Sequence, residues 1–278
     1  MASLSRRAVL VAAIAGLPGA FRSDAPAPPP GRHALVVTAY EYTFIAPDSA
    51  ASGMVTIRLV NRGKEAHQVT FARLDDSSSL PRVMRSLVRN ADHTGGIRWA
   101  GGVERALPGA SSETSVLLKP GRYVMVCAYG AEDGHAHMSR GMIRGLVVSS
   151  GAPSTNLVLP VAPVTIRLTD YRISISGELR AGRQLLRVEN VGRHLHQLSF
   201  SRLVGNTTME QLDKWDGKSK PSPIEGIGGG AAPMDAGQVS VISIALRPGR
   251  YVLDCGLSDT TGAKPHYMLG MEREITVK

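Results

Sequence analysis

Hydrophobic and polar residues alternate with a period of two along much of the chain. Val55, Ile57 and Leu59 are separated by polar residues, and the segments 164–168 and 242–246 repeat this pattern. Such alternation is typical of strands that bury one face. Because many short alternating segments are separated by Pro-Gly, Asn-x-Gly and Gly-Gly turns, the pattern predicts an all-β protein built as an antiparallel β-sandwich.

Two segments depart from the strand pattern and predict short helices. The first is 80–89, and the second is 209–215, which follows a possible N-cap at Thr207 or Thr208. Both segments lie between a His-containing strand and a Gly-Gly turn. We therefore expect a short helical insertion at the same place in two β-sandwiches.

The chain contains one unit twice. Residues 61–68 match 190–197 at an offset of 129, and residues 118–124 match 246–252 at an offset of 128. An offset that stays constant over this length indicates a duplication. The repeat predicts two tandem antiparallel β-sandwich domains, 31–150 and 160–278, joined by a short linker that contains Gly, Pro and Ser.

The first 25 residues have the pattern of an export signal. Arg6 and Arg7 precede an apolar stretch, Ala8 to Leu17, and small residues and prolines follow it. The paired arginines fit a twin-arginine (Tat) signal, and an ordinary Sec signal fits equally well. The sequence predicts an exported protein, periplasmic or extracellular, and has no apolar run long enough for a transmembrane segment.

Composition narrows the choice of partners. The 278 residues include 30 Gly and 17 Pro and carry a formal net charge of +9. The basic residues are scattered singly, without the runs or aromatic strands typical of nucleic-acid binding, so no nucleic-acid partner is expected. A basic surface suits an acidic protein partner or an anionic membrane face.

Histidine, cysteine and methionine recur at matching positions of the two units. Each unit offers two imidazoles, one thiol and one thioether, and two imidazoles with a thiolate and a weak axial Met are the ligand set of a type 1 copper site. The candidate metal ligands are His67, Cys127, His137 and Met142 in the first unit, and His196, Cys255, His266 and Met271 in the second.

Two other interpretations of the cysteines are open. Cys127 and Cys255 could form a disulfide, which is common in exported proteins, provided that the two sites face each other. Each could also be a small buried apolar residue. The joint recurrence of His, Cys and Met at the same spacing favours the metal hypothesis over both.

On these residues the sequence resembles the cupredoxin family of blue copper proteins. The early His after an Asn, the late Cys and the following His and Met keep the family's ligand order, and the closing His-x3-Gly-Met segments at 137–142 and 266–271 are similar to the type 1 loop of copper nitrite reductases. The resemblance implies that both domains are Greek-key β-sandwiches and that each holds one type 1 copper, two in all. It also implies that His137 and His266 lie toward the surface as electron exits.

The sequence departs from the enzymes of this family. Nitrite reductases and multicopper oxidases place a His beside the type 1 Cys, whereas Val126 and Asp254 precede the cysteines here. An enzyme is therefore the least favoured class. We expect an exported copper-binding protein that transfers single electrons with a redox partner; the alternatives are a copper storage or delivery protein, which would exchange metal with a copper donor or acceptor, and a metal-free interaction module.

Overall fold

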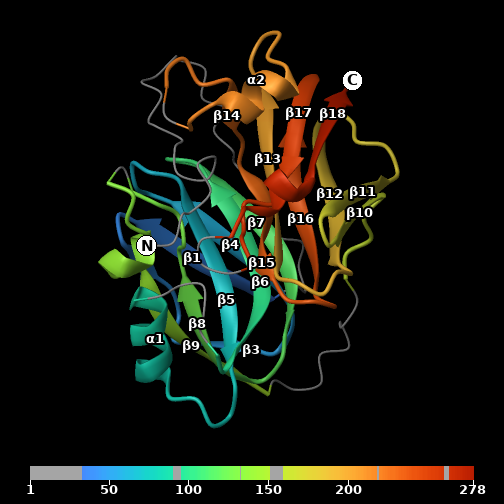
Figure 1. Cartoon of the computed structure of the whole chain (residues 1–278). Helices are drawn as coiled ribbons and strands as arrows, with labels where there is room; N and C mark the ends of the chain where they lie inside the picture. The colour runs from blue at the N-terminus through green and yellow to red at the C-terminus, as the bar shows by residue number, and fades with distance from the viewer. Residues whose placement is uncertain (1–32, 90–94, 132, 151–158, 218, 260–262) are drawn as a thin grey trace.

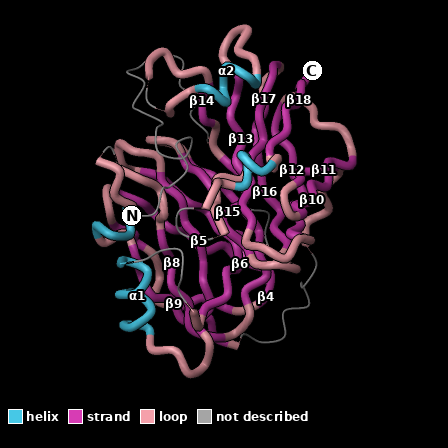
Figure 2. Tube along the Cα trace, in the orientation of Figure 1, coloured by secondary structure: helices cyan, strands magenta, loops and turns pink. Residues whose placement is uncertain are grey.

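The computed structural model describes residues 33–89, 95–131, 133–217, 219–259 and 263–278 apart from 151–158. The predicted export signal, 1–25, and the predicted linker, 151–156, lie outside the described residues. Strands dominate the fold, and the first unit lies at the lower left and the second at the upper right (Figures 1 and 2). In the described part of the chain, no helix is long and apolar enough to cross a membrane.

The described residues of the first half form nine strands, one α-helix and one 3-10 helix. They are β1 (His33–Tyr40), β2 (Thr43–Ile45), β3 (Ser49–Ala51), β4 (Gly53–Asn61), β5 (His67–Leu74), α1 (Leu80–Arg89), β6 (Ile97–Ala106), β7 (Ser111–Leu118), β8 (Gly121–Val126), η1 (His137–Arg140) and β9 (Ile143–Ser149).

The second half repeats this order with two exceptions. Its elements are β10 (Val164–Thr169), β11 (Arg172–Ser176), β12 (Gly182–Asn190), β13 (His196–Leu203), α2 (Met209–Lys214), β14 (Ile224–Gly226), β15 (Gly229–Met234), β16 (Val239–Leu246), β17 (Gly249–Asp254), η2 (His266–Leu269) and β18 (Glu272–Val277). It has no counterpart of β3 among the described residues, and it has an additional short strand, β14, after its helix. The two predicted helices are confirmed in both place and order. Thr208, one of the two expected caps, closes a capping box with Gln211 at the start of α2.

The strands form two large sheets, as the all-β sandwich prediction requires. One sheet has the order β11-β10-β12-β16-β7-β4-β1-β2, and the other has the order β18-β17-β13-β15-β6-β5-β8-β9-β3. Most neighbours are antiparallel, but β1 pairs with β4, β10 with β12 and β3 with β9 in parallel. Each half buries its own main apolar cluster between the sheets, within 35–148 and within 164–277.

The alternating segments place their apolar positions in these clusters. Ile57 and Leu59 on β4 are fully buried, as are Leu186 and Val188 at the matching positions of β12 and Ile166 and Leu168 on β10. Strand β5 is buried on both faces, because α1 covers its outer side through Val83 and Leu87.

Each sheet continues from one half into the other through strands that are copies of each other. Strand β6 pairs with β15 with Val103 opposite Ala231, and β7 pairs with β16 with Thr114 opposite Ile242. Both pairs differ by 128 positions, the offset that relates the repeats. Both pairings are antiparallel, so the two units are related by a local twofold axis at this seam, as the subunits of a symmetric dimer are.

One buried ion pair breaks this symmetry. Glu104 and Arg105 on β6 are almost fully buried, and their side chains lie 3.3 Å apart. Arg105 donates to the carbonyl oxygen of Phe200 at 3.1 Å, and Ser199 donates to Glu104 at 3.0 Å, so the pair connects the first unit to β13 of the second. A Cβ on Gly230 would lie 2.9 Å from that of Glu104, so glycine makes the room.

The substitution Arg105→Met tests this connection. It leaves the Glu104 carboxyl buried without its cation, and breaking a buried pair in this way costs about 3–5 kcal/mol. We expect the free energy of unfolding in denaturant to fall by that amount. The matched control, Arg180→Met, removes an exposed arginine and should change the free energy by less than about 0.5 kcal/mol; equal losses for both variants would contradict the prediction.

Candidate metal centres

A buried asparagine fixes the loop that carries the first histidine of each unit. The Asn61 side chain donates to the carbonyl oxygens of Glu65 and Ala106 at 2.7 and 2.8 Å and accepts from the Gly63 N–H. Asn190 makes the same three contacts in the second unit, to His194, Met234 and Gly192. These bonds close the turn before β5 and β13, so that His67 and His196 begin their strands at the same place.

The Cys, the second His and the Met lie on one continuous segment after β8 or β17. In the first unit the Cys127 N–H donates to the Met142 carbonyl oxygen at 3.1 Å, and the Met142 N–H donates to that of His137 at 3.0 Å. Gly141, at φ 109°, ends the short helix between them. The second unit has the same bonds among Cys255, Met271 and His266. The His-x3-Gly-Met spacing thus folds the outer His and the Met back toward the Cys.

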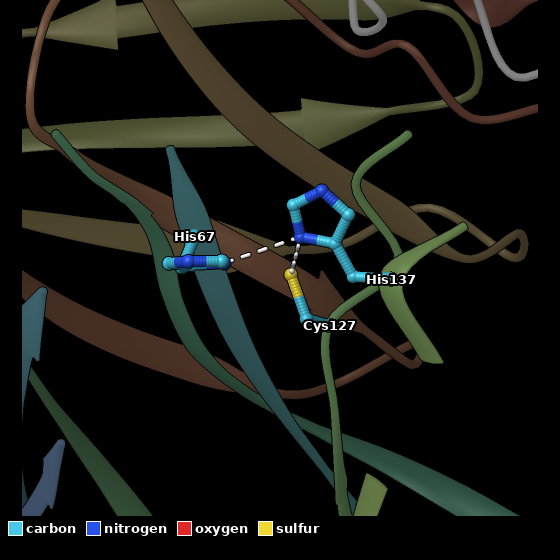
Figure 3. A group of neighbouring side chains, drawn as sticks. All are labelled: His67, Cys127 and His137. Atoms are coloured by element: carbon cyan, nitrogen blue, oxygen red, sulfur yellow. Dashed lines mark hydrogen bonds between the residues drawn. The ribbon is translucent and has the colours of Figure 1, made fainter. Parts of the chain in front are cut away.

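The first group brings three predicted ligands together. His67 Nδ1 lies 3.1 Å from His137 Nδ1, which lies 3.5 Å from Cys127 Sγ (Figure 3). One ligand atom from each of the three side chains lies within 4.8 Å of those of the other two. Met142 is fully buried in the apolar cluster that also contains Cys127.

The second group has matching geometry. His196 Nδ1 lies 3.2 Å from His266 Nδ1, and Cys255 Sγ lies 3.4 Å from His266 Nδ1 and 4.0 Å from His196 Nδ1. Met271 is fully buried in the cluster that contains Cys255. Two non-overlapping segments of the chain therefore build the same arrangement.

Burial keeps these donors uncharged. It raises the pKa of Cys127 and of Cys255 to about 12, so both thiols hold their protons at neutral pH. Burial and the neighbouring His137 lower the pKa of His67 to about 4, and burial lowers that of His266. The imidazoles are thus ready to bind a metal, whereas each Cys must release a proton as the metal binds.

A backbone N–H donates a hydrogen bond to each cysteine sulfur. The Gln68 N–H donates to Cys127 Sγ at 3.3 Å, and the Gln197 N–H donates to Cys255 Sγ at 3.4 Å. Hydrogen bonds around a metal-bound sulfur tune the redox potential of such a site. Both cysteines are free and fully buried, so the disulfide interpretation is wrong for this structure.

The expectation that His137 and His266 lie toward the surface is wrong. Both residues are only 1% exposed. The rings of Tyr42 and Tyr171 lie edge-on to them, at centroid distances of 5.1 and 5.0 Å. The outer imidazoles are therefore covered by aromatic side chains from the turns after β1 and β10.

Sequence reasoning missed the carboxylates around the imidazoles. Each ligand imidazole has a carboxylate oxygen near its Nε2 atom. In the first unit, Glu41 lies 3.7 Å from His67 and Glu65 lies 2.7 Å from His137. In the second unit, Asp170 lies 3.0 Å from His196 and Asp259 lies 2.8 Å from His266. Glu41-Tyr42 and Asp170-Tyr171 recur at the repeat offset, which is a sequence signal for two of them. Of the remaining histidines in these loops, His135 is exposed and His194 contacts Asp259 at 2.6 Å.

Comparisons with known proteins give only distant structural likeness. No model of a known protein family matches the chain, and no curated protein matches it. Auracyanin from Roseiflexus castenholzii is 15% identical over 43% of this chain and 98% of its own, with a TM-score of 0.31. Auracyanin A, a "blue" copper protein from Chloroflexus aurantiacus, is 16% identical over 43% of this chain and 100% of its own, with a TM-score of 0.31. The copper nitrite reductase of Thermus scotoductus is 15% identical over 89% of this chain and 62% of its own, with a TM-score of 0.24.

The donor sets of the chain itself fit copper. An ion bound about 2 Å from each Nδ1 would lie between imidazoles spaced like these. Two imidazoles, one thiol and a buried Met nearby make up the set that accommodates both Cu(I) and Cu(II). The chemistry of the donors thus agrees with the predicted ligands in both units.

Asn190→Ala tests how much the hydrogen bonds of this asparagine stabilise the fold around the second site. The change leaves the Gly192 N–H and the carbonyl oxygens of His194 and Met234 without this partner, at a cost of about 1–3 kcal/mol for each group that stays buried and unsatisfied. We expect a lower unfolding midpoint in denaturant. Asn206→Ala, at an exposed turn, is the control; the prediction fails if the two variants unfold alike.

Proposed function

We propose that the protein is an exported copper-binding protein that transfers single electrons through two type 1 sites. The observation that carries the proposal is the duplicated cluster of two Nδ1 atoms and one Sγ, fully buried and accompanied by a buried Met in each unit. Export is supported by the signal pattern of residues 1–25.

The residues have distinct parts in this function. When bound, copper supplies the one-electron couple. His67 and His137 would hold the ion, Cys127 would provide the strongest electronic coupling, and Met142 would tune the potential. The rigid strands and buried loop bonds keep the donors nearly fixed, which reduces reorganisation between the two oxidation states. His196, Cys255, His266 and Met271 would do the same in the second unit.

The two sites are placed to work separately. His67 lies opposite Ala106 at one end of β6, whereas His196 lies opposite Met234, which lies opposite Ala100. The six-residue difference along β6 alone is about 20 Å. Each site would therefore exchange electrons at its own face, with an acidic redox partner favoured by the net charge of +9.

Copper storage or delivery is the second candidate function. The specific observation in its favour is the burial of His137 and His266, which leaves neither outer imidazole at the surface for direct electron exchange. A storage protein would hold Cu(I) tightly and cycle slowly. Stopped-flow oxidation and reduction of the copper-loaded protein distinguishes the two functions, because an electron carrier completes both half-reactions rapidly.

Copper titration of the mature chain tests the proposal. We expect two Cu(II) per chain with an intense thiolate-to-copper absorption band, because each unit has one cysteine among its donors. Cys127→Ser and Cys255→Ser should each remove one equivalent and part of the band. A colourless copper complex would favour storage, and no binding, with an unchanged melting temperature, would leave the metal-free module.

Met142→Leu in the Cys255→Ser background tests the axial ligand. The substitution removes a donor that stabilises Cu(II), so the potential of the first site should rise while the thiolate band remains. Met138→Leu is the matched control, since Met138 is a buried Met of the same loop that packs beside α1. Equal potentials for the two variants would exclude Met142 as a ligand.

A further inference from the structure

Each outer ligand histidine is held by a tyrosine and a carboxylate that also contact each other. In the first unit the Tyr42 hydroxyl donates to Glu65 Oε1 at 3.2 Å, and Glu65 Oε2 lies 2.7 Å from His137 Nε2. In the second unit the Tyr171 hydroxyl donates to Asp259, whose Oδ1 lies 2.8 Å from His266 Nε2.

The two carboxylates do not correspond in the repeat. Glu65 precedes β5, whereas Asp259 lies in the segment between β17 and η2. The residue at the position of Glu65 in the second unit is His194, and its Nδ1 contacts Asp259 at 2.6 Å. The two copies thus bring a tyrosine, a carboxylate and the outer His together with different residues, through a hydrogen bond at His266 and at ion-pair distance at His137. The position of the carboxylate is therefore not inherited from the duplication.

The backbone of Tyr42 supports a specific role for its ring. Among the described residues, Tyr42 is the one non-glycine residue with a positive φ, 63°. Residues other than Gly, Asn and Asp rarely adopt this backbone conformation. Such strain persists where the surrounding contacts hold it, and it concentrates at functional sites. Here the ring is held between His137 and the Arg140 guanidinium, which lies 4.7 Å from its centroid.

We propose that Glu65 with Tyr42, and Asp259 with Tyr171, are positioning pairs that bias their sites toward Cu(II). A carboxylate beside Nε2 favours the tautomer with its proton on Nε2, which leaves the Nδ1 lone pair for the metal, and it makes the imidazole more electron-donating. Added donation stabilises the more highly charged ion, so the potential of each site is lower than it would be with a free Nε2. The tyrosine ring holds the carboxylate and covers the imidazole.

This inference rests on the proposed copper sites, and the experiment separates the two. Glu65→Gln is made in the Cys255→Ser background, so that only the first site can bind. We expect Cu(II) affinity to fall about tenfold, the lower end of the effect of removing such an outer partner. If Cu(I) affinity is unchanged, a tenfold loss raises the one-electron potential by about 59 mV. Asp259→Asn in the Cys127→Ser background should behave alike at the second site.

Asp48→Asn is the control for simple loss of negative charge. Asp48 lies in the same unit, and its exposed carboxylate contacts Arg144 but no ligand imidazole. It should leave both affinity and potential unchanged. Tyr42→Phe, which keeps the ring and loses the hydroxyl, should shift the potential in the same direction as Glu65→Gln, but less.

The outcomes distinguish the inference from the function. If the Cys255→Ser parent shows no thiolate-to-copper band, the proposed type 1 site itself is wrong. If the parent has the band and Glu65→Gln keeps its affinity and potential, the positioning role is overturned. A potential that shifts equally in Asp48→Asn also overturns it, because the effect is then general electrostatics. Thermal unfolding of each copper-free variant confirms that it is folded.

Discussion

The rest of the structure depends on the pairing of the two units through equivalent strands. Strands β6 and β15, and β7 and β16, would be open sheet edges in a single unit, with unpaired backbone groups. Joined, they extend both sheets through the molecule and bury the seam. Burial of Glu104 and Arg105 at the seam is tolerable because the two side chains pair with each other, because the Tyr129 hydroxyl bonds to both, and because each also contacts β13.

The same antiparallel seam separates the metal centres. Equivalent strands run in opposite directions across the seam. His67 therefore lies beside Ala106 of β6, whereas His196 lies beside Met234 of β15, which pairs with Ala100 of β6. Each centre is then completed locally, by an asparagine-fixed loop, a backbone N–H to the sulfur and a folded His-x3-Gly-Met segment. The duplication has therefore produced two equivalent sites rather than one shared site.

The outer imidazoles differ from what the family resemblance implies. Tyr42 and Tyr171 cover them, and carboxylates contact the nitrogens that would otherwise face water. The recurrence of these tyrosines was visible in the sequence, but their role was not. Glu65 and Asp259 share no position in the repeat, so no spacing argument could have joined them to the same task.

The sequence by itself predicted several of the strands, both helices and eight candidate ligands, six of which the structure brings together in two groups. Alternation and capping act over a few residues, and the sequence shows the ligands through their order and their recurrence in the two units. It also revealed the duplication, since an offset can be read directly. Only the tertiary structure decided how the copies meet, which buried charges connect them and what covers His137 and His266. Those features join residues tens of positions apart, and their pairing is set by packing in three dimensions, which no local pattern records.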